Sequence, residues 1–426
     1  MSIAICPQAR DLASRVREDR IWNRLEALAR FGALGTGVNR QALSREDMHA
    51  RRYLLDEAGA LGLQPMDDAV GNLYLRLEGS DPSLPPVLIG SHIDTQPTGG
   101  KYDGAYGVIA ALEVLQAVRE AGLTPRHPLE AVAWCNEEGS RFAPGAMGSA
   151  VFSGARALDD ALACRDAGGV SVAEAWQQVR AGLPAIAERR LPCPVHAYVE
   201  PHIEQGPILE RDGRAIGVVA GIQAVKWLRI TVSGREAHAG TTPMDGRQDA
   251  MAAACGLIRA IYDAAAQRGE PLRVTVGRLD AAPNSPNTIA NLVDFSLDVR
   301  HPRAQAVEEF IGEVERLCRT HAGPCKVESQ SVLDFPPTEF HPSIAGLVAG
   351  ACRELGLSHM EIVSGAFHDA RFLASVCPSG MIFVPCAEGI SHSLAEKASA
   401  PDLAAGARVL AAVAWTLAGQ DGSPGA

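Results

Sequence analysis

The stretch Val87-Leu88-Ile89-Gly90-Ser91-His92-Ile93-Asp94 joins a short aliphatic run directly to a histidine and an aspartate. A run of this length and composition predicts a buried β-strand with polar residues at its carboxyl end. Open α/β sheets place their ligand sites at that end of their strands. The stretch therefore predicts a fold class and the edge of the sheet at which a site would lie.

Further apolar runs follow along the chain. Residues 129–134, 198–200 and 381–384 are predicted to be strands. Residues 108–115 are predicted to form a helix between the strand that begins at Val87 and the strand at 129–134. Strands that alternate with crossover helices indicate an α/β fold. We expect a mixed, largely parallel sheet covered by helices on both faces.

A different order of elements interrupts this pattern. The alternation predicts strand, helix, strand, strand, helix and strand at residues 227–232, 247–267, 272–279, 291–299, 304–321 and 326–332. That order is typical of a ferredoxin-like sandwich. Because a chain of 426 residues also favours two cores, we expect a catalytic domain of residues 1–221 and 335–426, interrupted by an α+β domain of residues 222–334.

The composition narrows the class of partner. Apolar residues make up 47% of the chain and charged residues 21%, which excludes a disordered or fibrous protein. The formal net charge of -11 argues against a nucleic-acid or anionic-membrane surface, since both require clustered Lys and Arg. We therefore expect a small-molecule partner.

The ends of the sequence and the cysteines indicate a compartment. The first residues lack the basic and apolar segments of a signal peptide, and the apolar run at 409–419 has about half the length of a membrane span. The ten cysteines form no C-x-x-C pair, and several lie in apolar runs, namely Cys135, Cys255, Cys352 and Cys386. Buried reduced thiols and a cytoplasmic location are expected.

Two acidic residues follow the first strand. Asp94 lies two residues after His92, so His92 could bind a metal ion while Asp94 accepts its other ring proton. A strand-end histidine that caps a helix is the alternative. Asp103, within the glycine-rich residues 99–107, could bridge two cations or could cap the following helix. A phosphate-binding loop is disfavoured because no G-K-[ST] follows.

Glu137 and Glu138 follow the strand at 129–134. Two adjacent carboxylates at a buried strand end oppose each other's ionisation unless a cation compensates them. A division of roles follows, with Glu138 binding metal and Glu137 accepting a proton from water. As an isolated acidic pair, the two residues would more often form a solvated turn.

Two more histidines lie near strand ends. His202 closes the strand near residue 200, and His392 comes shortly after residues 381–384. Each alone is weak support for a site. Together with His92, Asp103 and Glu138 they form a mixed nitrogen and oxygen ligand set, which borderline divalent ions favour.

Six motifs carry a family resemblance. They are Ser91–Thr95, Gly99–Val108, Asn136–Phe142, His202–Pro207, Ala237–Met244 and Gly389–Ser393. Together the motifs resemble the hydantoinase/carbamoylase amidases, within the aminoacylase and carboxypeptidase superfamily of dinuclear zinc hydrolases. That group includes N-carbamoyl-L-amino acid hydrolases, allantoate amidohydrolases and β-ureidopropionases. The resemblance spans roughly residues 54–414 in matching order.

The resemblance implies a role for each matching residue of the catalytic domain. Two divalent ions, zinc with manganese, cobalt or nickel as alternatives, would be held by His92, Asp103, Glu138, His202 and His392, with Asp103 bridging. Glu137 matches the general base and Asp94 the acid that orients a histidine. Gln205 and His368 match residues that complete the substrate pocket.

The inserted domain is implied to be a lid that forms a homodimer. His238 matches a residue that reaches the partner's active site, and Asn287 and Arg300 match contacts to a substrate carboxylate. From the residues alone, His238 would be a core histidine, Asn287 a turn residue and Arg300 a capping or surface residue.

The implied reaction is cleavage of the carbamoyl C–N bond of an N-carbamoyl-L-amino acid, giving the amino acid, ammonia and carbon dioxide. Allantoate and N-carbamoyl-β-alanine are alternative substrates; a metallo-peptidase or a catalytically silent binding homologue are further alternatives.

Two residues depart from the family pattern: Phe367 stands where glycine is usual, and Ala290 where proline is common. We expect these departures to affect the substrate pocket rather than the metal chemistry.

Overall fold

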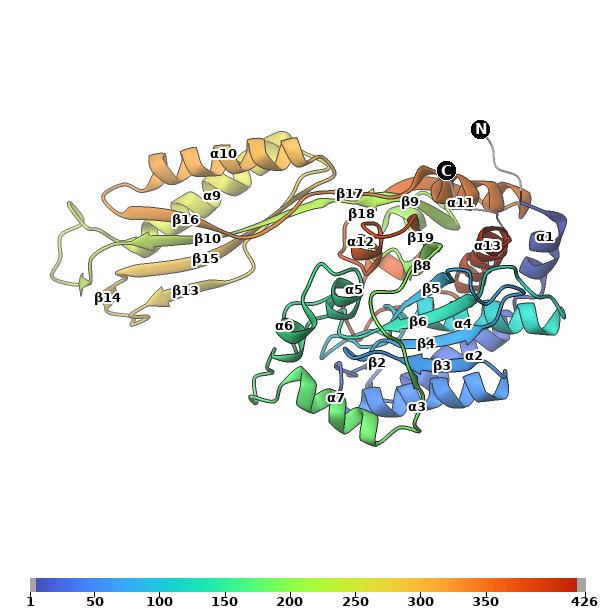
Figure 1. Cartoon of the computed structure of the whole chain (residues 1–426). Helices are drawn as coiled ribbons and strands as arrows, with labels where there is room; N and C mark the ends of the chain where they lie inside the picture. The colour runs from blue at the N-terminus through green and yellow to red at the C-terminus, as the bar shows by residue number, and fades with distance from the viewer. Residues whose placement is uncertain (1–4, 420–426) are drawn as a thin grey trace. The chain divides into compact units, whose positions relative to one another are not determined.

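The computed structural model describes residues 5–419, which divide into two compact units (Figure 1). The larger unit contains the chain up to Gly221 and from Glu339 onward, and the smaller unit runs from Ile222 to Thr338. The sequence analysis placed the inserted domain at residues 222–334; in the structure the last strand of the smaller unit runs from Lys326 to Phe335 and the unit ends at Thr338.

The larger unit is built on one sheet. Its strands lie in the order β17-β9-β19-β8-β5-β6-β4-β3-β7, and β18 pairs with β9. Their bounds are β3 Gln64–Asp67, β4 Leu73–Leu77, β5 Val87–His92, β6 Leu129–Trp134, β7 Ala187–Glu188, β8 Ala197–Ile203, β9 Ile216–Ile222, β17 Thr338–Glu339, β18 His359–Ser364 and β19 Ser379–Val384. A small hairpin, β1 (Ala33–Leu34) and β2 (Gly37–Val38), lies apart from this sheet.

The centre of the sheet is parallel. Strands β19, β8, β5 and β6 are neighbours that all run in the same direction, and every residue in them is buried. Strands buried on both faces have near-continuous apolar sequences, as these do. The predicted strands are confirmed, and the carboxyl ends of these parallel strands share one edge of the sheet.

Helices cover both faces of this sheet, as predicted (Figure 1). On one face, α4 (Ala105–Glu120) and α13 (Ala400–Ala418) pack against Ile89, Ala131 and Val199. On the other, the rings of Trp134 and Phe152, the last residue of α5, meet at 5.2 Å. The helices of this unit are α1 Pro7–Ser14, α2 Glu18–Ala29, α3 Arg45–Ala60, α4 Ala105–Glu120, α5 Met147–Phe152, α6 Leu158–Leu162, α7 Val172–Ala181, α8 Ile208–Arg211, α11 Pro342–Glu354, α12 Ala370–Leu373 and α13 Ala400–Ala418.

The smaller unit has the predicted ferredoxin-like order. Its antiparallel sheet is ordered β12-β15-β10-β16, with β13 also paired to β15, and α9 and α10 pack together on one face (Figure 1). The elements are β10 Ala224–Ser233, β11 Ala237–His238, α9 Ala250–Arg268, β12 Arg273–Thr275, β13 Leu279–Ala282, β14 Thr288–Ile289, β15 Leu292–His301, α10 Ala304–His321 and β16 Lys326–Phe335.

One strand prediction in this unit was too simple. The strand expected at residues 272–279 is divided into β12 and β13. Between them, the amide of Arg278 donates to the side-chain oxygen of Ser296 at 3.1 Å instead of to a carbonyl of β15. The side chain of Ser296 therefore takes the place of a backbone carbonyl as hydrogen-bond acceptor where the strand is interrupted.

The cysteines are all free thiols, and Cys135, Cys352 and Cys386 are buried as expected. The expectation of burial is wrong for Cys255, which is exposed. Helix α9 turns Ala250, Ala254 and Leu257 to the core, so the residue after Ala254 points about 100° away from that face. None of the helices in the described residues is long and apolar enough to cross a membrane.

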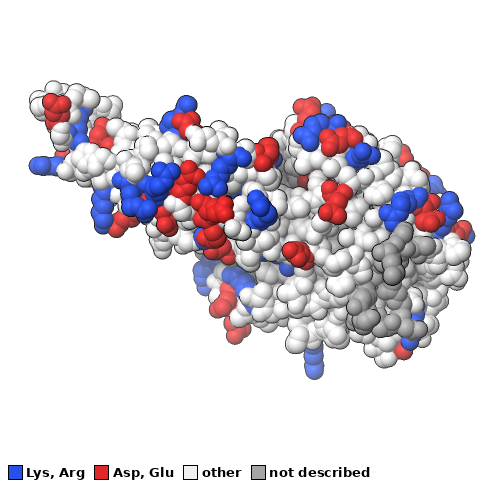
Figure 2. Space-filling view, turned by 90° about the horizontal axis from the view of Figure 1, so that it is seen from above, with Lys and Arg blue, Asp and Glu red and all other residues white. Residues whose placement is uncertain are grey.

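Charged side chains of both signs are interspersed on the surface. On the face drawn in Figure 2, Lys and Arg side chains lie among Asp and Glu side chains. Such mixing suits a small-molecule partner better than a polyanion, which requires clustered positive charge.

Candidate active site

The predicted ligand residues of the larger unit meet at the shared carboxyl edge of the sheet. His92 is the last residue of β5, and His202 lies one residue before the end of β8. Glu138 follows β6, Asp103 precedes α4, and His392 follows the 3-10 turn Ala387–Gly389 that comes after β19. Parallel strands thus bring together residues that are far apart in the sequence.

Asp103 is shared by two groups of ligand atoms. Its Oδ1 lies 3.2 Å from Nε2 of His202 and 3.9 Å from Nε2 of His92. Its Oδ2 lies 3.2 Å from Nε2 of His392, which is 3.3 Å from Oε2 of Glu138. Within each group the ligand atoms lie within 4.8 Å of one another. Asp103 thus offers one carboxylate oxygen to each group of ligand atoms. A carboxylate that bridges two metal ions has the same arrangement.

A glycine makes this approach sterically allowed. Gly104 has a φ of +62°, and a Cβ there would lie 2.3 Å from the imidazole ring of His92. Its amide also lies 3.2 Å from Nε2 of His202. The backbone therefore passes directly against both rings, which a side chain at this position would displace.

Backbone strain is also concentrated here. Asn136, Gln205 and His392 have φ values of +56°, +56° and +53°. Positive φ is uncommon for residues other than glycine, and such conformations cluster at functional sites where surrounding structure enforces them. Each of these residues is a predicted site residue or is adjacent to one.

The carboxylates at the site oppose one another. Burial raises the pKa of Glu138 to about 8, and the neighbouring Asp103 contributes to the same shift. Burial also raises the pKa of Glu137 well above its usual value, with further contributions from Asp369 and Glu138. Crowded buried carboxylates of this kind are stabilised by a nearby positive charge.

The imidazoles differ in their ability to bind a cation. Burial lowers the pKa of His92 to about 4, so this ring is neutral and offers a lone pair. A hydrogen bond with Asp103 raises the pKa of His392 to about 9. Burial by itself would raise the pKa of Asp103, but hydrogen bonds from His202 and His392 outweigh burial and hold it well below its usual value.

The donor set fits divalent cations. Three imidazole nitrogens converge with the carboxylates of Asp103 and Glu138, and the raised pKa values of Glu138 and of the neighbouring Glu137 mark uncompensated negative charge. Borderline ions favour such mixed nitrogen and oxygen ligands. Divalent cations bound here would compensate the negative charge of these carboxylates.

Glu137 lies beside these ligands. Its Oε2 is 3.6 Å from Nε2 of His92, and its side chain is 9% exposed. The amides of Glu137 and Glu138 donate to the two carboxylate oxygens of Asp94 at 3.2 and 3.1 Å. Asp94 thus fixes the turn that carries both glutamates.

Asp94 orients His92 differently from our expectation. We expected its carboxylate to accept the second ring proton, but that carboxylate lies 3.8 Å from Nδ1 of His92. The backbone carbonyl of Asp94 makes the contact instead, at 2.9 Å. The carboxylate is turned toward the amides of Glu137 and Glu138, so one residue orients the ring through its main chain and the glutamate turn through its side chain.

The predicted pocket residues of this unit lie next to the ligands. Gln205 donates from Nε2 to Asp103 at 2.9 Å, while its Oε1 is buried without a hydrogen-bond partner in the part of the chain that the structure describes. The ring of His368 packs edge-on against that of His202, with centroids 4.5 Å apart. Phe367 is half-buried and packs against Phe372, with ring centroids 5.8 Å apart.

The remaining predicted residues belong to the smaller unit. His238 on β11 pairs with Thr288 on β14, which places it beside Asn287. Nδ1 of His238 accepts hydrogen bonds from the amides of Gly240 and Thr241 at 3.0 and 3.2 Å. Arg300, near the end of β15, is held by Asp298 at 2.8 Å.

Sequence reasoning missed residues that hold the ligands. Gln96 donates to Glu138 from its amide at 3.1 Å and from its side chain at 2.7 Å. The hydroxyl of Ser391 lies 3.3 Å from Oδ2 of Asp103. Their position beside predicted ligands in the sequence was the available signal, but it does not specify which atom each would contact.

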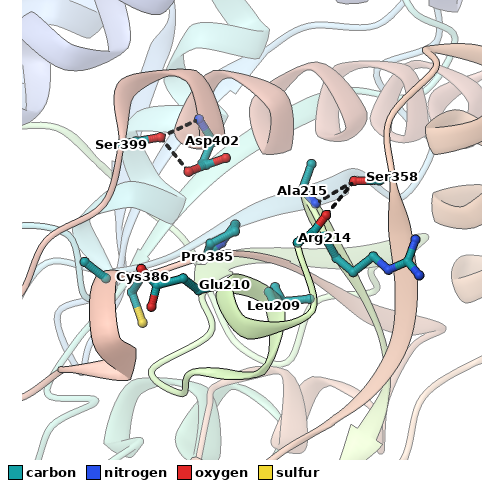
Figure 3. A pocket seen from close by; sticks show the side chains of 11 residues that line it. Leu209, Glu210, Arg214, Ala215, Ser358, Pro385, Cys386, Ser399 and Asp402 are labelled. Carbon is teal, nitrogen blue, oxygen red and sulfur yellow. Dashed lines mark hydrogen bonds between the residues drawn. The ribbon is translucent and has the colours of Figure 1, made fainter.

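A separate hollow of about 360 Å³ lies in the larger unit (Figure 3). It is lined by α8, the segment after β19 and the start of α13. Its polar side chains serve local structure, since Ser399 caps α13 through the amide of Asp402 and Ser358 accepts from the amide of Ala215. The ligand set described above is therefore the candidate catalytic centre.

Comparison with known proteins agrees with this class of site. The profile of peptidase family M20/M25/M40 matches residues 88–416, most of the chain. The chain belongs to this family of hydrolases, and the solved structures similar to it include amidases of the hydantoinase/carbamoylase family.

Individual relatives match more than nine tenths of the chain. An N-carbamoyl-L-amino-acid amidohydrolase from Rhizobium meliloti is 39% identical over 402 residues, covering 93% of this chain and 95% of the relative. The allantoate amidohydrolase of Bacillus subtilis is 36% identical over 407 residues, covering 94% and 98%. A crystal structure of a hydantoinase/carbamoylase family amidase from Burkholderia multivorans is 37% identical, with a TM-score of 0.86 and coverage of 95% and 98%.

The contact between Gly104 and His92 gives a test of the site. Gly104→Ala should lower divalent-ion affinity by about tenfold or more, because the new Cβ displaces a ligand ring. Gly122→Ala is a matched control, since Gly122 has a φ of +66° and no atom within 4 Å of its Cβ position. Ion affinity is measured by competition with a chromophoric chelator. Equal affinity in both variants would contradict the placement of His92 in the site.

Proposed function

We propose that the chain is a metal-dependent amidohydrolase that cleaves the carbamoyl C–N bond of an N-carbamoyl-L-amino acid. The products would be the amino acid, ammonia and carbon dioxide. The observation that carries the proposal is the pair of ligand groups sharing Asp103, with Glu137 beside them. The names of full-length relatives at up to 39% identity support the substrate class.

Two divalent ions are proposed as cofactors, zinc first, with manganese, cobalt and nickel as alternatives. His92, Asp103 and His202 would hold one ion, and Asp103, Glu138 and His392 the other. When bound, such ions supply Lewis-acid activation of a water molecule and of the scissile carbonyl.

Glu137 is proposed as the general base and acid. Its carboxylate lies beside the ligands, with Oε2 3.6 Å from Nε2 of His92, and its side chain is 9% exposed, so bulk water is largely excluded from it. It would take a proton from the attacking water at Oε2 and pass it to the departing nitrogen. Asp94 holds the backbone of this residue in place through the amide of Glu137.

Gln205 is proposed to recognise the ureido group. Its buried Oε1 is an acceptor without a partner among the described residues, and a terminal ureido NH₂ is a donor of suitable size. Allantoate also carries ureido groups, and the 36% identical allantoate amidohydrolase makes allantoate the second candidate substrate. His368, packed on His202, would form the adjacent wall of the pocket.

The smaller unit is proposed to act as a lid in a homodimer. Because Nδ1 of His238 accepts two amide hydrogen bonds, the ring proton is on Nε2, which can donate to a developing oxyanion in the partner's active site. Arg300 and Asn287 would bind the substrate carboxylate, for which the planar guanidinium is well suited.

A reducing compartment is consistent with the ten free thiols. We propose the cytoplasm as that compartment.

A substrate panel tests the proposed reaction. N-carbamoyl-L-amino acids, N-carbamoyl-β-alanine, allantoate and a dipeptide are assayed for release of ammonia and of free amino acid. N-carbamoyl-L-amino acids should release ammonia, chelation should abolish the release, and added zinc, manganese, cobalt or nickel should restore it. Amino acid release from the dipeptide alone would reject the proposal in favour of a peptidase.

The role of Glu137 is tested by Glu137→Gln. Loss of the base should lower kcat by about 10²–10⁴-fold, while the ions measured by elemental analysis remain. Glu361→Gln, at an exposed position on β18, is the matched control and should keep full activity. A Glu137→Gln variant that retains wild-type kcat would remove the assignment.

Sharing of His238 across a dimer is tested by mixing two inactive variants. In a heterodimer of a His238→Ala subunit and a Glu137→Gln subunit, one active site has both an intact Glu137 and the partner's intact His238. Random mixing should therefore restore about a quarter of wild-type activity in a symmetric dimer. Activity that stays at the level of the unmixed variants would show that each His238 serves its own chain.

A further inference from the structure

Glu396 connects two segments that carry metal ligands, and the catalytic roles described above do not include it. Its side chain is buried, with the residue 4% exposed, near the end of the loop between β19 and α13. Oε1 accepts hydrogen bonds from the amides of Tyr102 and Asp103 at 2.9 and 3.1 Å. Oε2 accepts from the hydroxyl of Ser391 at 2.8 Å.

The two segments joined in this way are far apart in the sequence, with 288 residues between the positions of Asp103 and Ser391. Asp103 supplies an oxygen to each ligand group, and Ser391 directly precedes His392. Bonds from a single carboxylate therefore fix the backbone of the bridging aspartate and the residue next to a histidine ligand. The Ser391 hydroxyl is also 3.3 Å from Oδ2 of Asp103, so the same hydroxyl contacts both carboxylates.

The chain leaves space for this carboxylate. A Cβ on Gly100 would lie 1.9 Å from Oε1 and 2.0 Å from Cδ of Glu396. The absence of a side chain at Gly100 is what allows Glu396 to reach the amides of Tyr102 and Asp103. The φ of Gly100 is in the range that other residues adopt, so alanine there changes the space and not the backbone preference.

We infer that Glu396 is a positioning residue that sets the separation of Asp103 and His392, and thereby the affinity of the site for its ions. The inference rests on the proposed two-ion site. Partners of this kind, which contact ligands and not the ion, commonly change metal affinity by about 10–100-fold when they are removed. For this role, the side chain of Glu396 must be long enough to hydrogen-bond to both the segment of Asp103 and the segment of Ser391.

The variants distinguish the effect of the hydrogen bonds made by Glu396 from the effect of its negative charge. In Glu396→Gln the amide oxygen can accept from Tyr102 and Asp103, and the amide nitrogen can donate to the oxygen of Ser391, which preserves the bridge without the charge. Glu396→Ala removes the bridge, and Gly100→Ala displaces it from the other side. Glu388→Ala, at an exposed position of the same loop, is the matched control.

The test measures zinc binding to the full chain by competition with a chromophoric chelator, and the visible absorption of cobalt as a report on ligand geometry. Glu396→Ala and Gly100→Ala should weaken binding of at least one ion by about 10–100-fold and alter the cobalt spectrum. Glu396→Gln and Glu388→Ala should stay close to the unaltered chain. Thermal unfolding in excess chelator shows that each variant is folded without metal.

Each outcome decides between the possibilities. Wild-type affinity and spectrum in Gly100→Ala or in a folded Glu396→Ala would overturn the inference, as would a Glu396→Gln variant that loses the ions as Glu396→Ala does. If Glu396→Ala does not fold, Gly100→Ala and Glu396→Gln still decide. Failure of the unaltered chain to bind two ions would instead overturn the proposed two-ion site.

Discussion

Burial of several carboxylates at one edge of a sheet is the constraint on which the site depends. Glu137, Glu138 and Asp103 lie close together in a region where burial raises the pKa of Glu138 to about 8. Such a group is stable only if positive charge compensates it. His92 and His202, at the ends of neighbouring strands, and His392, in the loop after β19, lie beside it. The parallel order β19-β8-β5-β6 supplies this arrangement, because it delivers each ligand to the same edge.

The backbone around the site is shaped to let these side chains meet. Gly104 brings the main chain against the His92 ring, and Gly100 leaves room for Glu396. Asp94 holds the turn of Glu137 and Glu138 through two amides. These contacts involve main-chain groups as much as side chains, so the precision of the ligand set is a property of the loops that join strands to helices.

The sequence was sufficient to predict the strands, the edge of the sheet at which the candidate site lies and the candidate ligands. It was not sufficient to predict the hydrogen bonds that hold these residues in place. Apolar runs identified β5 and β6 because strands buried on both faces have continuous apolar sequences. The direction in which the Asp94 carboxylate turns could not be predicted, since it depends on the amides of a turn more than 40 residues away. The bridge of Glu396 to Tyr102 spans 294 residues, and the exposure of Cys255 depends on which face of α9 the sheet covers.

The residues with proposed roles belong to both units. All the proposed ion ligands and Glu137 belong to the larger unit, whereas His238, Asn287 and Arg300 belong to the inserted unit. With these proposed roles, bond cleavage and carboxylate recognition would belong to different parts of the chain, and substrate preference could change without altering the ligands. Ala290, which stands where proline is common in the family, lies in the inserted unit. Its carbonyl accepts a hydrogen bond from the first amide of α9. Phe367, the other departure from the family pattern, lies in the larger unit instead. It directly precedes His368, whose ring packs against that of the proposed ligand His202.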